Sequence, residues 1–159
     1  MERLTLSNQF RILAKLEPGQ AKTCELNAEI LERGYKALYA DIFENIWDET
    51  DSETYREVAD TLDLYRAFEA HKRKGGNIPE SYYAEFRGFD GNHECDHYSI
   101  CAFMRREQGK WAELADHPDN SHGPTVSTYR QMVREWDRLG REFDLSSEQV
   151  ASIMAAATR

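Results

Sequence analysis

The sequence lacks the cysteine pattern of a small protein stabilised by disulfide bonds. It contains three cysteines, an odd number without a disulfide-type spacing: Cys24, Cys95 and Cys101. We therefore expect reduced thiols, which are typical of cytoplasmic proteins. Cys95 and Cys101 lie six residues apart, which is neither a C-x-x-C redox pair nor a same-face helical spacing. We interpret them as structural thiols.

Long apolar runs and an excess of basic charge are also missing. No apolar run reaches the length of a membrane span, and the first ten residues show no segment of signal-peptide type. The chain carries 20 basic and 29 acidic residues, a formal net charge of −9. A net negative charge repels nucleic acids and anionic membranes, so we expect no membrane partner and disfavour a nucleic-acid partner.

Nucleotide-binding and hydrolase signatures are absent as well. The sequence holds no P-loop, no G-x-G-x-x-G, no nucleophile elbow and no zinc-ribbon spacing. We therefore expect no cofactor, and we assign no catalytic or cofactor-binding residue.

What the sequence does contain is enough apolar material for one globular domain. It has 159 residues, of which 40% are hydrophobic and 31% charged. We expect a single domain over residues 1–159, with residues 1–76 and 77–159 as two sub-lobes within it.

The strongest helix signal covers residues 50–76. Thr50 and Glu53 have the spacing of a capping box, and Gly75 or Gly76 can end the helix. Apolar residues recur at three- and four-residue steps between these ends: Tyr55, Val58, Leu62, Tyr65 and Phe68. The sequence thus predicts a long amphipathic helix that must pack against other elements.

Other segments also have helical periodicity, and none alternates as a strand would. We expect further helices over residues 8–17 with Ser7 as N-cap, 21–33 with Gly34 as C-cap, 36–47, 91–108 with Asp90 as N-cap, 125–141, and a short one after the Ser146–Gln149 capping box. The prediction is an all-α fold of roughly seven helices. A helical hairpin over about residues 36–74 would pack against a second helical lobe.

Several stretches together resemble the YfbU family of small bacterial proteins. They are LSNQF at 6–10, ILERGY at 30–35, Leu64-Tyr65, GFD at 88–90, His122-Gly123, Trp136 and Leu145-Ser146. The resemblance covers most of the chain and implies an all-α fold with a helical hairpin against a second lobe. It implies no catalytic residues, because the family has no established biochemical activity.

The sharpest chemical motif is His93-Glu94-Cys95-Asp96-His97, an H-E-x-x-H pattern. On a helix, histidines four residues apart can bind one zinc ion, and the glutamate can activate a bound water molecule. His122, His117 or Asp119 could supply a third ligand. A zinc-dependent hydrolase is therefore an alternative, with His93, His97 and His122 as candidate ligands. The favoured interpretation is a polar helix start with two surface histidines.

Two further groups are candidates for a ligand or partner surface. His122 and Asp119 lie in a loop rich in glycine and proline, where a histidine could bind a ligand or act as a base. A row of arginines follows one face of the helix expected at 125–141: Arg130, Arg134, Arg138 and Arg141. The row could contact nucleic acid, which would make the protein a regulator. We favour a solvated face paired with Glu135, Asp137 and Glu142 or with an acidic neighbour.

The aromatic residues and the predicted hairpin point to packing rather than chemistry. We interpret a cluster after the long helix as core: Tyr82, Tyr83, Phe86 and Phe89. The many apolar positions on the hairpin predict a homodimer. The sequence as a whole favours a cytoplasmic protein that acts through protein–protein contacts rather than by catalysis.

Overall fold

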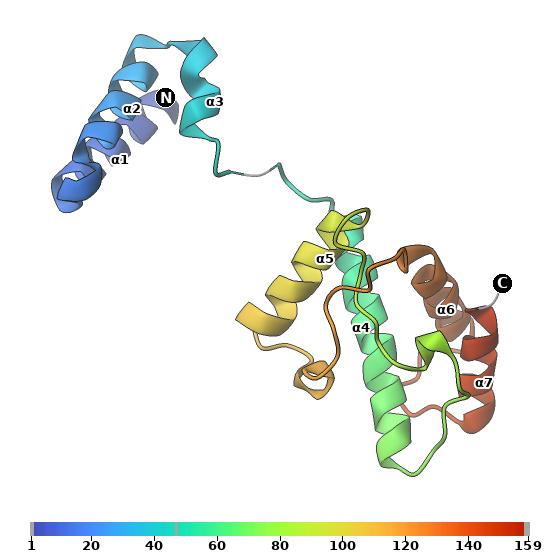
Figure 1. The fold of residues 1–159 in the computed structure, drawn as a ribbon. Coiled ribbons are helices and arrows are strands. Elements are labelled where there is room, and N and C mark those ends of the chain that lie inside the picture. Colours follow the sequence, from blue (N-terminus) through green and yellow to red (C-terminus); the bar gives the residue numbers. More distant parts are fainter. Residues whose placement is uncertain (1, 47, 158–159) are drawn as a thin grey trace. The chain divides into compact units, whose positions relative to one another are not determined.

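The chain folds into α-helices joined by turns and loops (Figure 1). The computed structural model describes residues 2–46 and 48–157. Within these residues the helices are α1 (Glu2–Leu16), α2 (Ala21–Arg33), α3 (Tyr39–Ile42), α4 (Ser52–Arg73), α5 (Cys95–Ala102), α6 (Val126–Arg138) and α7 (Ser147–Ala156). Extended pairing among them is limited to one isolated bridge between Phe89 and Asn120. The all-α prediction is confirmed.

The chain divides into two compact units, Met1–Glu49 and Thr50–Arg159, which we call the N-terminal and C-terminal units. The division lies before α4, so the long helix belongs with the segments that follow it. The sub-lobe boundary expected at residue 76 differs from this division, which lies between Glu49 and Thr50. The assignment of residues 1–159 to one domain stays a prediction.

The N-terminal unit is built on α1 and α2, which pack side by side (Figure 1). Pro18 follows the end of α1 and opens a short 3₁₀ turn. Gly34 ends α2 in the left-handed conformation at φ 71°, as predicted. The prediction that Ser7 caps the first helix is wrong, because α1 already begins at Glu2. Ser7 is instead buried, and its hydroxyl donates to the Ala28 carbonyl at 3.2 Å.

The helix predicted over residues 36–47 is mostly not formed. A 3₁₀ turn over Lys36–Leu38 leads into α3, which has four residues, and the chain is irregular after Phe43. Trp47 lies outside the described residues. Aromatic and β-branched side chains lose rotamer freedom in a helix, and this segment has little buried contact to offset that loss. A one-turn helix cannot form the first arm of the predicted hairpin, so that prediction was wrong.

The long helix α4 is confirmed, although it begins differently from the prediction. Asp51, not Thr50, is the N-cap, and its carboxylate accepts from the Glu53 amide at 2.9 Å. The predicted apolar stripe is buried from Val58 to Phe68, whereas Tyr55 is exposed. The helix ends at Arg73, and Gly75 follows with φ 85°.

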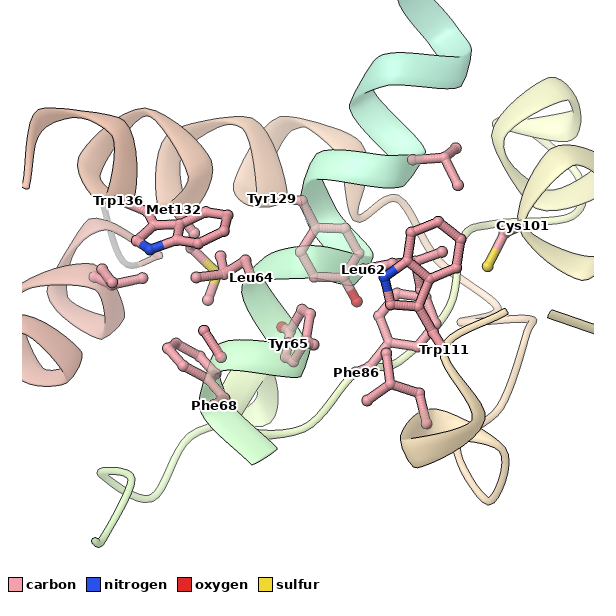
Figure 2. Packing of buried hydrophobic residues seen from close by; sticks show 14 of the residues in the cluster. Leu62, Leu64, Tyr65, Phe68, Phe86, Cys101, Trp111, Tyr129, Met132 and Trp136 are labelled. Atoms are coloured by element: carbon pink, nitrogen blue, oxygen red, sulfur yellow. The ribbon is translucent and has the colours of Figure 1, made fainter. Parts of the chain in front are cut away.

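The core of the C-terminal unit gathers around α4 (Figure 2). Its centre is a group of aromatic rings, in which Tyr65 lies 5.4 Å from Phe86 and 5.6 Å from Tyr129 between ring centroids. Phe89 and Trp136 are also fully buried. The core role expected for the segment after α4 is confirmed for Phe86 and Phe89, while Tyr82 is exposed.

The later helices are shorter than predicted, and their ends show why. α5 begins at Cys95 and continues into a π-helical turn over Phe103–Glu107. Asp90 is therefore not its N-cap; the Asp90 carboxylate instead accepts from the Asn92 amide and closes a turn before the helix. The capping box of α7 is confirmed, with reciprocal bonds between Ser146 and Gln149.

The long loop between α5 and α6 contacts the rest of the C-terminal unit at Gly88 and at Arg105. Gly88 has φ 82°, and a Cβ atom there would lie 2.2 Å from the Asp119 backbone, so only glycine fits. The phenylalanine that follows donates its amide to the Asp119 carbonyl at 2.9 Å. Arg105 lies beneath the loop and donates to the carbonyls of Leu114, His117 and Pro118. A glycine and one buried guanidinium thus fix an otherwise irregular segment.

Candidate functional site

The two histidines of the H-E-x-x-H pattern lie in different environments. His93 precedes α5 and is exposed, and its Nδ1 lies 2.6 Å from Asp90 Oδ2. His97 lies inside α5 and is largely buried, with Nε2 2.8 Å from Glu57 Oε2. Because α5 begins at Cys95, the pattern is not a continuous helical turn that presents both imidazoles on one face.

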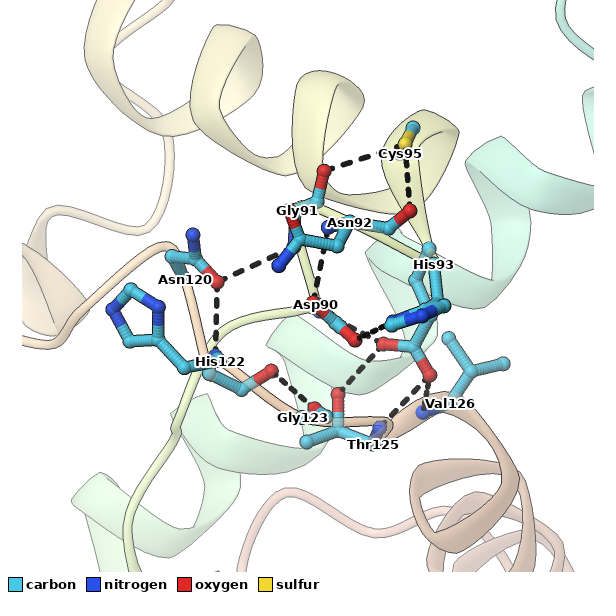
Figure 3. Close-up of polar contacts among 12 residues, drawn as sticks. Asp90, Gly91, Asn92, His93, Cys95, Asn120, His122, Gly123, Thr125 and Val126 are labelled. Carbon is cyan, nitrogen blue, oxygen red and sulfur yellow. Dashed lines mark hydrogen bonds and ion pairs between the residues drawn. The ribbon is translucent and has the colours of Figure 1, made fainter.

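Glu94, the central residue of the pattern, is occupied with loop and helix backbone (Figure 3). One carboxylate oxygen accepts from the amides of Thr125 and Val126, each at 2.8 Å. The other accepts from the Asp90 amide at 2.9 Å and the Thr125 hydroxyl at 3.1 Å. The carboxylate therefore caps the N-terminus of α6, where negative charge is favourable. Its contacts are those of a structural cap.

The loop residues considered as a third metal ligand have other contacts. The Asp119 side chain is 5% exposed and forms ion pairs with Arg105, at 2.5 Å, and with Arg106. Asp119 is therefore not a surface group, contrary to its interpretation as part of a partner surface. His117 Nε2 lies 3.8 Å from Glu69 Oε1. Across residues 2–46 and 48–157, no three His, Cys, Asp or Glu side chains are grouped to hold a metal ion.

His122 lies at a strained position of the same loop. Its φ is 55°, an unusual value for a residue with a side chain, and its amide donates to Asn120 Oδ1 at 2.9 Å. Figure 3 shows its imidazole directed away from the contacts around Asp90. The structure brings His122 together with neither His93 nor His97, so the three candidate ligands do not form one site.

The cysteines are far from redox-pair geometry. Cys101 is buried, and burial raises the pKa of its thiol to about 12. Cys95 is exposed, and its thiol donates to the Gly91 carbonyl at 3.3 Å. The structural role predicted for the pair fits Cys101; Cys95 is a surface residue.

Most of the arginine row on α6 is engaged in ion pairs. Arg138 pairs with Glu135 at 2.6 Å, and Arg141, beyond the helix end, contacts Asp60 and Asp137. Arg130 reaches across to Glu57 on α4 with two hydrogen bonds. These contacts agree with the favoured interpretation of the row as a paired, solvated face.

Glu57 lines a groove between α4 and α6, with a volume of about 450 Å³. Phe89, Val126 and Val133 contribute apolar lining, and His97 reaches into it from α5. Hydrogen bonds from Arg130 and His97 lower the pKa of the Glu57 carboxyl, although its partial burial acts in the opposite direction. One carboxylate therefore joins three helices.

The groove brings charged and aromatic side chains together at His97. The Glu57 carboxylate orients the His97 imidazole, which also packs against the Phe89 ring at 5.5 Å. The lining hydroxyls have structural partners: Thr61 donates to the Glu57 carbonyl at 2.7 Å, and Tyr129 accepts from the Arg87 amide at 3.1 Å. The His97 imidazole is therefore fixed by Glu57 and Phe89 where it lines the groove.

Glu57→Gln is expected to destabilise the C-terminal unit by about 1 kcal/mol at neutral pH, because exposure of Arg130 screens the lost ion pair. A carboxyl with a lowered folded-state pKa stabilises above its ordinary pKa and loses that contribution as pH falls through the lowered value. The difference between wild type and Glu57→Gln in urea denaturation should therefore stay constant between about pH 7 and pH 5 and shrink as pH falls below 4.5, the ordinary pKa of a glutamate. A difference independent of pH would contradict the ion-pair assignment.

The second candidate surface is apolar and lies on the N-terminal unit. Among the described residues, large apolar side chains are exposed at twelve positions, eight of them in this unit: Leu4, Ile12, Leu13, Leu16, Leu26, Tyr35, Leu38 and Ile46. Ile12 is 57% and Leu16 71% exposed. We define the apolar stripe as the exposed residues Ile12, Leu13 and Leu16 on α1, together with the half-buried Leu6.

Neither the groove between α4 and α6 nor the apolar stripe on α1 could be identified from the sequence. The helical spacing of Leu13 and Leu16 was visible in the sequence, but that spacing does not show whether the two side chains are buried. Glu57 had no local signal at all, because its partners His97 and Arg130 lie 40 and 73 residues away. A helical period shows that a face is apolar and not what covers it.

Together these features define an all-α protein with a charged groove and an exposed apolar N-terminal face. No helix in the described part of the chain combines the length and apolarity needed to cross a membrane.

The chain belongs to the YfbU family: the YfbU domain matches residues 1–156. It is also similar to the UPF0304 protein MJECS11 of Methanocaldococcus jannaschii. The two chains are 34% identical over an alignment 168 positions long, which covers 98% of each chain. The resemblance seen in the sequence is thus confirmed. Neither name specifies an activity, and the bacterial origin of the chain stays a prediction.

Proposed function

We propose that this YfbU-family protein acts through protein–protein contacts made by its N-terminal unit rather than by catalysis. The observation that carries this proposal is the apolar stripe on α1. Buried positions among the described residues of Met1–Glu49 are limited to Ser7, Cys24, Ala28, Ile30 and Leu31. So small a core does not normally stabilise a unit of this size without a partner.

The composition of α1 supports the same proposal. One side of α1 packs on α2 through residues such as Ser7. The apolar side chains of the stripe are instead largely exposed. A helix that is apolar on two sides is typically buried on both. Contiguous exposed apolar surface marks a contact site in soluble proteins. A cytoplasmic location, expected from the unpaired cysteines, is part of this proposal.

The two alternatives lack comparable support. A zinc hydrolase would use His93, His97 and Glu94, whose contacts are separate and structural. A nucleic-acid regulator would use arginines that are mostly paired with carboxylates. No observation favours either over a contact protein.

Site-specific photo-crosslinking tests the proposal. A benzophenone amino acid replaces Ile12 on the stripe in one variant and Lys22, an exposed position of α2, in a control variant. The probe at position 12 is expected to yield one discrete crosslinked protein in cells, identified by mass spectrometry, and the probe at position 22 none. Equal or absent crosslinking at the two positions would refute the proposal.

A further inference from the structure

The groove between α4 and α6 has walls of opposite charge. Three carboxylates line it from α4 and two guanidiniums from α6: Glu53, Glu57, Asp60, Arg130 and Arg134. Phe89, Val126 and Val133 add apolar lining. A simple anion would meet the three carboxylates here, and a simple cation would meet the two guanidiniums. The lining is therefore complementary to a ligand that carries both charges and an apolar middle.

Some of these charges already have partners. Glu57 accepts from Arg130 and His97, a contact that we call the Glu57 bridge. Arg141, just beyond the end of α6, pairs with Asp60, which follows Glu57 on α4. Both partners in this second contact come after the bridge in sequence. The two helices therefore run in the same general direction along the groove.

Two charges of opposite sign are left unpaired, one on each side of the Glu57 bridge. Glu53 lies one helical turn before Glu57, and Arg134 lies one turn after Arg130. Both are exposed, and neither forms an ion pair within residues 2–46 and 48–157. Two turns of helix, roughly 11 Å, separate them along the groove. Arg130 and Arg134 are also like charges at a four-residue step, an unfavourable arrangement that an anion beside them would relieve.

We propose that the groove binds a short peptide with free termini, whose ammonium group pairs with Glu53 and whose carboxylate pairs with Arg134. About three extended residues span the roughly 11 Å between the two charges. This binding is separate from the contact made by the N-terminal unit, so it extends the proposed function and does not depend on it.

The Glu57 bridge favours a peptide over other zwitterions. Arg130 binds Glu57 through Nε and Nη2, and its Nη1 group has no partner in the described part of the chain. Nη1 can therefore donate to a peptide carbonyl that crosses the bridge. Val126 and Val133 lie on either side of Arg130 in α6, where they would contact apolar side chains of the peptide.

Calorimetric titration of the full chain tests the site, with trivaline as the probe. We expect one trivaline to bind per chain with a dissociation constant below about 1 mM. N-acetyl-trivaline lacks the ammonium group and trivaline amide lacks the carboxylate, so each should bind at least roughly 10-fold more weakly. No binding of trivaline, or equal affinities for the three peptides, would overturn the proposal.

Substitutions assign the two ends of the peptide. Arg134→Gln should weaken trivaline binding roughly 10-fold and leave the affinity for trivaline amide unchanged. Glu53→Gln should weaken trivaline binding equally and leave the affinity for N-acetyl-trivaline unchanged.

Two control variants change the same residue types outside the groove. Arg138 pairs with Glu135 on α6, and Glu148 lies exposed in the first turn of α7. Arg138→Gln and Glu148→Gln should bind trivaline as the wild type does. Equal weakening by the groove variants and the control variants would contradict the site, as would a loss of trivaline amide binding in Arg134→Gln.

Discussion

Replacing Arg105 by methionine is expected to destabilise the C-terminal unit by about 3–5 kcal/mol, the largest effect of any single substitution considered for this chain. The Arg105 side chain is 5% exposed and lies over the Phe86 ring at 5.3 Å. Its guanidinium donates to three loop carbonyls and to the Asp119 carboxylate. Methionine keeps much of the volume but removes the donor to the His117 and Pro118 carbonyls and leaves the buried Asp119 carboxylate with Arg106 alone as its cationic partner.

Its neighbour Arg106 is a matched control for this prediction. Arg106 pairs with the same carboxylate of Asp119 but is 69% exposed. Arg106→Met should therefore cost less than about 1 kcal/mol. Urea denaturation followed by the fluorescence of buried Trp111 and Trp136 measures both variants. Similar losses for the two arginines would show that burial of the first is not what stabilises the loop.

Replacing Glu94 by alanine is expected to cost about 2–4 kcal/mol in the same assay. The substitution leaves the Thr125 and Val126 amides at the start of α6 without their acceptor, and it frees the Asp90 amide. It also removes a negative charge from the helix N-terminus. Glu94→Gln should cost less, because one amide oxygen still accepts while the charge is lost.

The neighbouring Asp96 provides the control within the same motif. It is exposed in the first turn of α5, so Asp96→Ala should cost less than about 1 kcal/mol. A Glu94→Ala protein with unchanged stability would contradict the assignment of Glu94 as a helix cap. It would also return the H-E-x-x-H pattern to consideration as a chemical site.

The elements that could be predicted from the sequence are those whose signals are local. The limits of α2, the C-cap at Gly34 and the capping box at Ser146 all depend on residues within one or two turns. The predicted first cap of α1 at Ser7 failed, because serine also suits a buried helical position where a carbonyl is within reach. The helix after residue 36 failed because apolar spacing alone does not stabilise a helix without packing partners.

The candidate site could be predicted only in part. His97 and Arg130 were both named from the sequence, but in two separate hypotheses, a zinc site and an arginine row. The structure joins them through Glu57, a residue in the second turn of α4 for which the sequence suggested no role. Asp119 shows the opposite error: its loop context indicated exposure, whereas two consecutive arginines from a π-helical turn hold it inside.

By itself the sequence determined the all-α class, the family and the positions of helices such as α2 and α4, because helical periodicity and capping depend on residues a few positions apart. Only the tertiary structure decided that Glu94 caps a helix 31 residues later, that Glu57 gathers His97 and Arg130, and that the stripe on α1 is exposed. These outcomes depend on which segments meet in space. Glu94 and Glu57 bind residues that are distant in the chain, so their roles cannot be deduced from local sequence. Whether a leucine is buried likewise depends on the segment that packs against it.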